Sequence, residues 1–354
     1  MQKLIETTLG IFDLRTELIE LGCKKFFLVA DPSLDNERVI NSLEAFDIPY
    51  VRFSSFAMNP TRQQASAAVE AFRREDCDSV VSIGGGSTLD VAKWVKSETC
   101  VPLIAVPTTI GTGCEATPFV VLTVDGIKLH LRNENMLPDV VIFDPTLVDT
   151  LPIYQRKCGS LDTFAHAVES MWSHKATDET IAYAKEALQI ILTNYRDYVF
   201  DYTHQAARQM FRASHLAGQA IAHTHTTAVH ALSFPLTTQL GLPHGHAVGL
   251  CLPQVMEFVM RNASQCNDPR GEGHLIQMLK EIASIMHGVS ISDAIVRLRI
   301  VLAELQLAVP LGVTMDDVER LTDAIDLERI GNSPVPFTRE DVKELYRKIL
   351  RIRL

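Results

Sequence analysis

One aspartate and three histidines in the second half of the chain have the types and spacing of a metal site. Asp162 and His166 are four residues apart in a predicted helix with Ser160 as its N-cap, so both side chains project from one face. His230 and His244 follow later in the chain. One carboxylate oxygen and three imidazole nitrogens suit Fe(II), Zn(II) or Mn(II) better than calcium or magnesium. A single histidine is more often a hydrogen-bonded core or surface residue, so the prediction depends on the whole set.

The segment GGGSTLDVAK, residues 84–93, has the composition of a phosphate-binding turn. Gly84, Gly85 and Gly86 let bare backbone amides approach an anion, and the helix predicted to follow adds the positive end of its dipole. A pyrophosphate would fit there. The segment could equally be a tight turn between a strand and a helix capped by Ser87, because it is neither GxGxxG nor a Walker loop.

Two further segments favour a dinucleotide. Asp31 ends a predicted strand, where its carboxylate could bind an adenosine ribose and repel the extra phosphate of NADP; it could also simply form a turn before Pro32. PTTIGTG, residues 107–113, supplies Thr108, Thr109 and Thr112 at the end of another strand. Ligands of open parallel sheets bind at the carboxyl ends of the strands, and all three segments are expected there.

The elements that must position these residues fall into two halves. In the first half, apolar runs at 26–30, 79–83 and 103–106 end at Asp, Gly or Pro, and a helical pattern covers 62–74. This alternation predicts buried parallel strands with crossover helices, a doubly wound α/β (Rossmann-like) domain. From about residue 159 the pattern is helical. We therefore expect an α/β dinucleotide-binding domain at residues 1–152 and an all-α metal-binding domain at residues 153–354.

The composition excludes several classes of partner. The 354 residues carry a formal net charge of −10, and the pI is about 5.6, which argues against nucleic acid or an anionic membrane as a partner. The start MQKLIETTLG lacks the pattern of a secretory signal, and no apolar run approaches the roughly 20 residues of a membrane helix. Seven cysteines form no CxxC pair. We expect free thiols and a cytoplasmic location.

Taken together, four motifs resemble those of the iron-containing (group III) alcohol dehydrogenases, relatives of glycerol dehydrogenase and dehydroquinate synthase. They are GGGSTLDVAK, PTTIGTGCEAT, the DxxxH of Asp162 and His166, and His230 followed by PHG at His244, in matching order. The resemblance implies a dinucleotide-binding domain, a helical domain, a cleft between them, and a homodimer or larger homo-oligomer.

The resemblance also assigns residues to sites. It makes Asp162, His166, His230 and His244 the ligands of one divalent metal, Fe(II) or Zn(II). Around NAD(P)H, with NAD favoured by Asp31, it places Asp31, Asn59, Gly84, Gly85, Gly86, Ser87, Asp90, Thr108, Thr109, Thr112 and Lys128.

Phe234 departs from the family pattern, because many members carry a histidine at that position, four residues after the third ligand. The proton must then come from water, a cofactor ribose hydroxyl or an imidazole such as His246. The segments ALSFPLTTQLGLPHGHAVGL and ESMWSHKAT resemble those of the subgroup that reduces phosphonoacetaldehyde to 2-hydroxyethylphosphonate. His225 stands where that subgroup often has an arginine. Positive charge for an anionic substrate could come from His223, His225, His246, Lys128 and Arg132.

The expected function is therefore metal-dependent, NAD(P)H-linked reduction of a small aldehyde. The metal would polarise the carbonyl while the nicotinamide delivers hydride. The substrate could be anionic, such as phosphonoacetaldehyde, or a carboxylated or neutral aldehyde or diol of the succinic semialdehyde, lactaldehyde or glycerol type. Two alternatives from other classes are a lyase or cyclase of the dehydroquinate synthase type and a non-catalytic binding protein.

Overall fold

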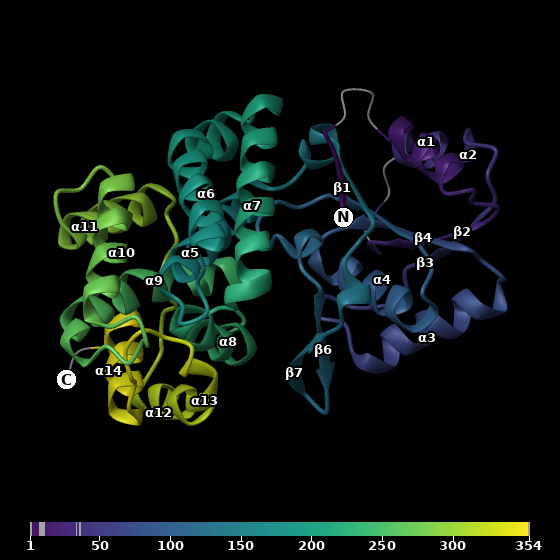
Figure 1. The fold of residues 1–354 in the computed structure, drawn as a ribbon. Coiled ribbons are helices and arrows are strands. Elements are labelled where there is room, and N and C mark those ends of the chain that lie inside the picture. Colours follow the sequence, from purple (N-terminus) through teal and green to yellow (C-terminus); the bar gives the residue numbers. More distant parts are fainter. Residues whose placement is uncertain (1, 7–10, 33, 35–36, 353–354) are drawn as a thin grey trace. The chain divides into compact units, whose positions relative to one another are not determined.

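The computed structural model describes residues 2–6, 11–32, 34 and 37–352, which divide into two compact units (Figure 1). The first unit comprises Met1–Leu151 and Tyr202–Phe211, and the second comprises Pro152–Asp201 and Arg212–Leu354. Helix α7 (His204–Thr224) therefore begins in the first unit and ends in the second.

A six-stranded sheet forms the centre of the first unit. Its order is β1-β8-β5-β4-β2-β3, and every neighbouring pair is parallel. Its strands are β1 (Lys3–Glu6), β2 (Phe26–Ala30), β3 (Tyr50–Phe53), β4 (Ser79–Gly84), β5 (Leu103–Pro107) and β8 (Val140–Phe143). Strands β2, β4, β5 and β8 are buried along their whole length, which explains why they are almost entirely apolar.

Helices cover both faces of this sheet. Helices α1 (Phe12–Glu20) and α2 (Glu37–Glu44) pack on the face that carries Leu28 and Val106. Helices α3 (Arg62–Arg74) and α4 (Gly86–Thr99) pack together on the opposite face (Figure 1). Thr61 and Gln64 form a capping box that fixes the start of α3. This arrangement is a doubly wound α/β unit.

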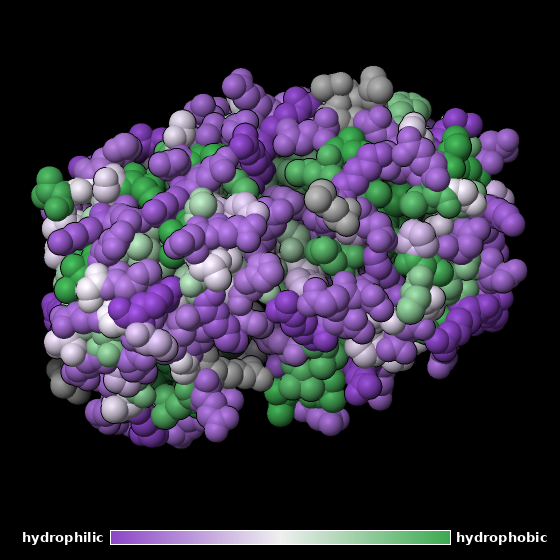
Figure 2. Space-filling model, viewed as in Figure 1, coloured by the Kyte–Doolittle hydropathy of each residue, from purple (hydrophilic) through white to green (hydrophobic). Residues whose placement is uncertain are grey.

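A two-stranded antiparallel hairpin, β6 (Phe119–Val124) and β7 (Ile127–Arg132), lies beside the main sheet. Lys93 joins the start of the hairpin to α4, because its buried ammonium donates to the carbonyls of Cys114, Thr117 and Phe119. Hydrophobic atoms gather on the surface over the hairpin (Figure 2), where Ile127 is 59% exposed.

The second unit is built from helices alone within its described residues. They are α5 (Ile153–Trp172), α6 (Asp178–Arg196), the later part of α7, α8 (Ala228–Leu240), α9 (His244–Arg261), α10 (Glu272–Ile285), α11 (Ile291–Glu304), α12 (Met315–Asp323), α13 (Leu327–Ile330) and α14 (Arg339–Ile349). Helix α5 is the centre of the unit, buried from Ser160 to Trp172 and packed against α6 and α9.

Glycine lets α9 approach α5 closely. A Cβ atom at Gly245 would lie 2.1 Å from the carbonyl oxygen of Cys158, and one at Gly249 would lie 2.5 Å from a methyl carbon of Leu161. A side chain at position 245 would require the two helices to separate, because it meets backbone, whereas one at position 249 would require the Leu161 side chain to move. This contact brings the first turn of α9, with His244, beside the middle of α5, with Asp162.

The predicted fold class is confirmed: a parallel α/β unit is followed by a helical one. The predicted N-cap role of Ser160 is wrong. Helix α5 begins at Ile153 after Pro152, and the Ser160 hydroxyl donates to the carbonyl of Arg156, 2.9 Å away, inside the helix. Sequence reasoning also missed the short strands β1, β3 and β8 and the hairpin. Every helix among the described residues is too short or too polar to cross a lipid bilayer.

Candidate metal and cofactor sites

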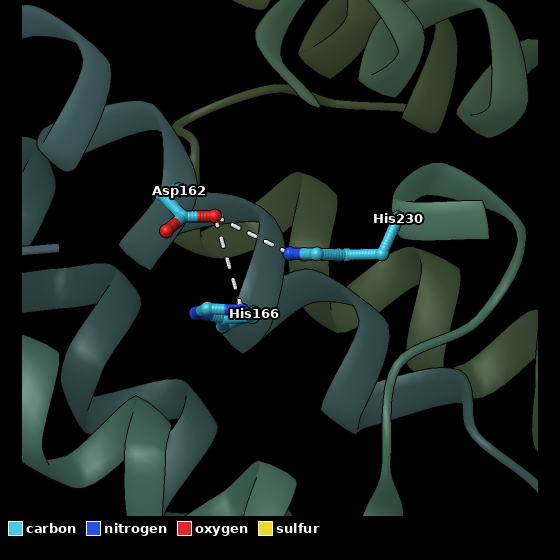
Figure 3. A group of neighbouring side chains, drawn as sticks. All are labelled: Asp162, His166 and His230. Carbon is cyan, nitrogen blue, oxygen red and sulfur yellow. Dashed lines mark hydrogen bonds and ion pairs between the residues drawn. The ribbon is translucent and has the colours of Figure 1, made fainter. Parts of the chain in front are cut away.

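Asp162, His166, His230 and His244 converge in the helical unit from α5, α8 and α9. The Oδ1 atom of Asp162 is 3.3 Å from Nε2 of His230, 3.6 Å from Nε2 of His244 and 3.8 Å from Nε2 of His166. Figure 3 shows Asp162 and His166 on one helix and His230 approaching from another. Ligand atoms of these three residues all lie within 4.8 Å of one another.

This group fits a divalent transition metal. Two of the three separations exceed the length of a hydrogen bond, so hydrogen bonding does not account for three imidazoles turned toward one carboxylate oxygen. One oxygen and three nitrogen donors match Fe(II) or Zn(II). The site is enclosed, since Asp162, His166 and His230 are 3%, 5% and 2% exposed. The side chain of His244 is 31% exposed and leaves one side accessible.

The pKa shifts of Asp162 and His230 show that these four side chains favour a bound positive charge. Burial raises the pKa of Asp162, but the neighbouring His166, His244 and His230 outweigh it and lower that pKa. Burial lowers the pKa of His230, but the carboxylates of Glu169 and Asp162 outweigh it and raise the pKa to about 9. The pocket therefore keeps its carboxylate ionised and attracts a proton or a cation in its place.

His246 does not join this group, although it lies two residues after His244. Its Nδ1 is 2.8 Å from the hydroxyl of Tyr154, in the first turn of α5. Burial lowers the pKa of His246, and the backbone of Ala308 opposes this only in part. Phe234 stacks on His244 with ring centroids 5.7 Å apart.

Two of the three histidines predicted for an anionic substrate lie at the end of α7, whereas the third, His246, lies in α9. His223 is exposed in the last turn of α7, and His225 follows in the left-handed backbone region with φ 54°.

In the first unit, the glycine-rich segment forms the turn between β4 and α4. Strand β4 ends at Gly84, and α4 begins at Gly86 with Gly85 as its N-cap. A Cβ at Gly84 would lie 2.3 Å from the hydroxyl oxygen of Thr88, and one at Gly85 would lie 3.0 Å from that of Thr109. The turn therefore requires glycine for steric reasons, and its α-helix supplies the N-terminal amides that bind anions.

The other predicted cofactor residues gather around this turn. The amide of Asp31 donates to Ile83, 3.1 Å away, and that of Thr108 to Gly84, 3.0 Å away, so the ends of β2, β4 and β5 are neighbours. A Cβ at Gly86 would be 3.7 Å from Thr112. The structure thus brings Asp31, Thr108, Thr109 and Thr112 to one edge of the sheet.

Asn59, Ser87, Asp90 and Lys128 form a second part of this edge. Asn59 adopts φ 60°, and its amide donates to Ser87 Oγ at 3.1 Å. Lys128 Nζ donates to Asn59 Oδ1 at 2.8 Å. Asp90 accepts a hydrogen bond from the amide of Val121, and burial raises its pKa to about 7 although Lys93 and Lys128 oppose this. The loop at Asn59, the start of α4 and the hairpin are therefore tied together.

Two residues of these sites were missed by sequence reasoning. Lys93 is fully buried and holds the segment after the threonines through three carbonyls. Glu169 is fully buried and hydrogen-bonded to Nδ1 of His230. Helical spacing could have indicated Glu169, because it follows His166 by three residues and Asp162 by seven, on the same face of α5.

Comparison with known proteins agrees with this picture. The model of the family described as iron-containing alcohol dehydrogenase matches residues 7–145, and that of the C-terminal part of the Fe-containing alcohol dehydrogenase family matches residues 157–350.

Three relatives illustrate the similarity. A phosphonoacetaldehyde reductase of Streptomyces viridochromogenes is 30% identical, covering 80% of this chain and 79% of that protein. Maleylacetate reductase 1 of Rhodococcus opacus is 30% identical, covering 83% and 79%. The crystal structure of sulfoacetaldehyde reductase from Bifidobacterium kashiwanohense, in complex with NAD+, has the same fold, with a TM-score of 0.89 at 23% identity over 99% of this chain and 98% of that one.

Proposed function

Because the chain belongs to the iron-containing alcohol dehydrogenase family, we propose that it reduces a small anionic aldehyde to its alcohol, with phosphonoacetaldehyde as the leading candidate. The family assignment makes the chain an oxidoreductase that acts on alcohols or aldehydes. The observation that supports the reaction type is the convergence of three histidine nitrogens on one oxygen of the buried Asp162.

In this proposal, Asp162, His166, His230 and His244 hold the metal. The bound metal acts as a Lewis acid on the substrate oxygen, and a bound reduced nicotinamide supplies hydride. The surrounding helices exclude water from three of the four ligands, which strengthens every electrostatic interaction in the pocket. The partly exposed His244 leaves one side through which substrate can enter.

The cofactor binds at the carboxyl edge of the sheet in the first unit. The turn at Gly84–Ser87 and the start of α4 bind the pyrophosphate, and Thr108, Thr109 and Thr112 contribute hydroxyl groups beside it. Asn59, Asp90 and Lys128 support the same edge. Asp31 favours NADH over NADPH, because its carboxylate repels a 2′-phosphate.

The proton on the product oxygen does not come from position 234, because phenylalanine has none to give. Water, a ribose hydroxyl or His246 remain as sources. If His246 contributes, Tyr154 orients it, since the Tyr154 hydroxyl bonds its Nδ1.

An anionic substrate is supported by the relative that reduces phosphonoacetaldehyde. Basic side chains occur at Lys128 and Arg132 in the hairpin, where Lys128 bonds Asn59 and Arg132 pairs with Glu134, and at His223 in the last turn of α7 and His225 just after it. A carboxylated substrate is the second candidate, because the maleylacetate reductase is equally identical over a similar share of the chain. A homodimer or larger assembly in the cytoplasm completes the proposal.

A substrate panel tests this function. Metal-loaded protein would be given phosphonoacetaldehyde, sulfoacetaldehyde, succinic semialdehyde, lactaldehyde and glycolaldehyde, each with NADH and with NADPH. We expect kcat/KM to be at least about tenfold higher for the phosphonate than for glycolaldehyde, since one good charged contact contributes that much. Equal kcat/KM values for all five aldehydes would exclude a preference for an anionic substrate. Substrate turnover without net oxidation of NADH would indicate a lyase or cyclase instead.

A further inference from the structure

Glu169 is a fully buried carboxylate that lies one turn beyond His166 on α5. It is not one of the proposed metal ligands, yet it contacts one of them directly. A buried carboxylate is costly unless all its hydrogen-bonding capacity is used, so its partners indicate what it does.

The two oxygens of Glu169 have different partners. Oε2 is hydrogen-bonded to Nδ1 of His230. Oε1 accepts from the amide and the hydroxyl of Thr227, at 2.8 and 2.5 Å, and from the amide of Val229, at 3.0 Å. These amides belong to the start of α8, whose N-cap residue Thr227 makes no side-chain cap of its own. Glu169 therefore supplies the cap from a different helix.

The bond to Oε2 determines which nitrogen of His230 carries a proton. An ionised carboxylate only accepts, so Nδ1 must donate to Glu169. Without a metal, Nε2 also faces a carboxylate and carries a second proton; a bound metal ion takes the place of that proton, and Glu169 keeps the other one on Nδ1. Nε2 is the atom that faces Asp162 Oδ1, at 3.3 Å (Figure 3). A carboxylate behind a ligating histidine fixes the ring and makes the other nitrogen a stronger donor.

We propose that Glu169 is a positioning residue for the metal: it holds His230 with Nε2 available as a ligand, and it couples this orientation to the start of α8. The inference rests on the proposed metal site, because it needs His230 to be a ligand. It assigns a role to one carboxylate that neither the ligand set nor the cofactor edge requires.

Glu169→Gln separates the two roles. The glutamine carbonyl oxygen can still accept from Thr227 and Val229, so the cap is retained. Its amide nitrogen would face Nδ1 of His230 as a donor, which favours the opposite tautomer, with the proton on Nε2. The substitution should therefore impair metal binding more than folding.

Two variants serve as controls. Thr227→Val removes the hydroxyl bond to Glu169 and the acceptor of the Trp172 indole, but leaves Glu169 and His230 in contact. Ser170→Ala removes a hydrogen bond, 3.0 Å long, between the neighbouring residue and Thr224, in an equally buried place that does not touch the ligands. Both variants show how much a lost hydrogen bond in this part of the helical unit changes the unfolding temperature and the Zn(II) Kd.

The experiment is a titration of each metal-free protein with Zn(II) against a chromophoric chelator, together with the unfolding temperature of each metal-free protein. We expect Glu169→Gln to raise the Zn(II) Kd by about 10- to 100-fold, with both controls within about threefold of the parent. An unchanged Kd in Glu169→Gln, with only a lower unfolding temperature, would show that Glu169 is a cap and nothing more. A parent protein that binds no Zn(II) would overturn the metal site itself, which distinguishes the two failures.

A measurement on the parent keeps the inference testable if Glu169→Gln does not fold. In Zn(II)-loaded protein with ¹⁵N-labelled histidine, the His230 signals are assigned by their loss in His230→Gln. We expect a protonated Nδ1. A deprotonated Nδ1 in His230 would contradict the proposal.

Discussion

The metal group and the glycine turn differ in what holds them in place. The metal group depends on charge: Asp162, three imidazoles and Glu169 come from α5, α8 and α9, and each is stable in the interior only because of the others. The glycine turn depends on the absence of side chains, since a Cβ at Gly84 would collide with Thr88 and one at Gly85 would lie tightly, 3.0 Å, against Thr109. The metal group is therefore sensitive to removal of one of its side chains, and the glycine turn is sensitive to addition of a Cβ atom.

The largest effect is expected when one of the four proposed metal ligands is removed. His244→Ala should lower turnover on the order of 10³-fold, because Lewis-acid stabilisation of the transition state amounts to several kcal/mol. The fold should survive, since His244 is the least buried of the four ligands. Elemental analysis measures the metal content, NADH oxidation measures turnover, and circular dichroism measures whether the fold is intact.

The matched control is His204→Ala, which removes a surface histidine whose ring bonds Asp149 at 2.9 Å in the first unit. Normal metal content and normal turnover in His244→Ala would show that His244 is not a ligand.

Adding one methyl group where α9 meets α5 should cost about 3 kcal/mol of unfolding free energy in Gly245→Ala, because overpacking against a backbone carbonyl cannot relax locally. The displacement of α9 should also reduce metal content. Gly273→Ala, at an open position in α10, should be neutral or slightly stabilising. Urea unfolding of both variants gives the comparison, and equal midpoints would contradict the close approach of the helices.

At the edge of the sheet proposed to bind the cofactor, burial raises the pKa of Asp90, and this gives a pH dependence. Its folded pKa of about 7 is raised above its ordinary value of 3.8, so the folded state binds the proton more tightly. Stability from this group is fully present below pH 3.8 and is lost as the pH rises through 7. The difference in unfolding free energy between Asp90→Asn and the parent should therefore rise, in favour of Asp90→Asn, by about 2 kcal/mol from pH 5 to pH 8. Urea midpoints at several pH values measure this gain.

Asp47→Asn, at an exposed position in the same unit, is the control for Asp90→Asn. A difference between Asp90→Asn and the parent that does not change with pH would mean that Asp90 is ionised throughout the range.

The smallest expected effect concerns the glycine turn itself. Gly85→Ala places a Cβ 3.0 Å from Thr109 at the N-cap of α4. We expect about a tenfold rise in the KM for NADH, because the backbone can no longer approach a phosphate as closely. Metal content should not change. Loss of metal in Gly85→Ala, with an unaltered KM, would reverse the contrast between the two sites.

Local patterns in the sequence account for much of this structure. The buried strands and α3 follow from apolar runs and helical spacing, and the turn after β4 follows from its glycines. The start of α5 does not, because Pro152 begins the helix earlier than Ser160, which had the more familiar capping chemistry. Strands β1, β3 and β8 are only four residues long, too short for a periodic signal.

The sites show the same division. The four-residue spacing predicts that Asp162 and His166 share one helix face. Their proximity to His230 and His244 depends on how α8 and α9 pack on α5. His246 looked equally suited for chemistry, and only the structure shows its ring bonded to Tyr154. Lys93 acts through backbone carbonyls, which have no pattern in the sequence. Helical spacing places Glu169 on the face of Asp162 and His166, but its bonds to the start of α8 and to the second nitrogen of His230 depend on the packing of the helices.

Anomalous diffraction from Zn(II)- or Fe(II)-loaded crystals tests most directly whether the four proposed ligand side chains hold one metal ion. We predict one strong peak per chain at about 2.0–2.2 Å from an oxygen of Asp162 and from nitrogens of His166, His230 and His244. A peak bound by other residues, or none at this group in fully loaded protein, would contradict the account.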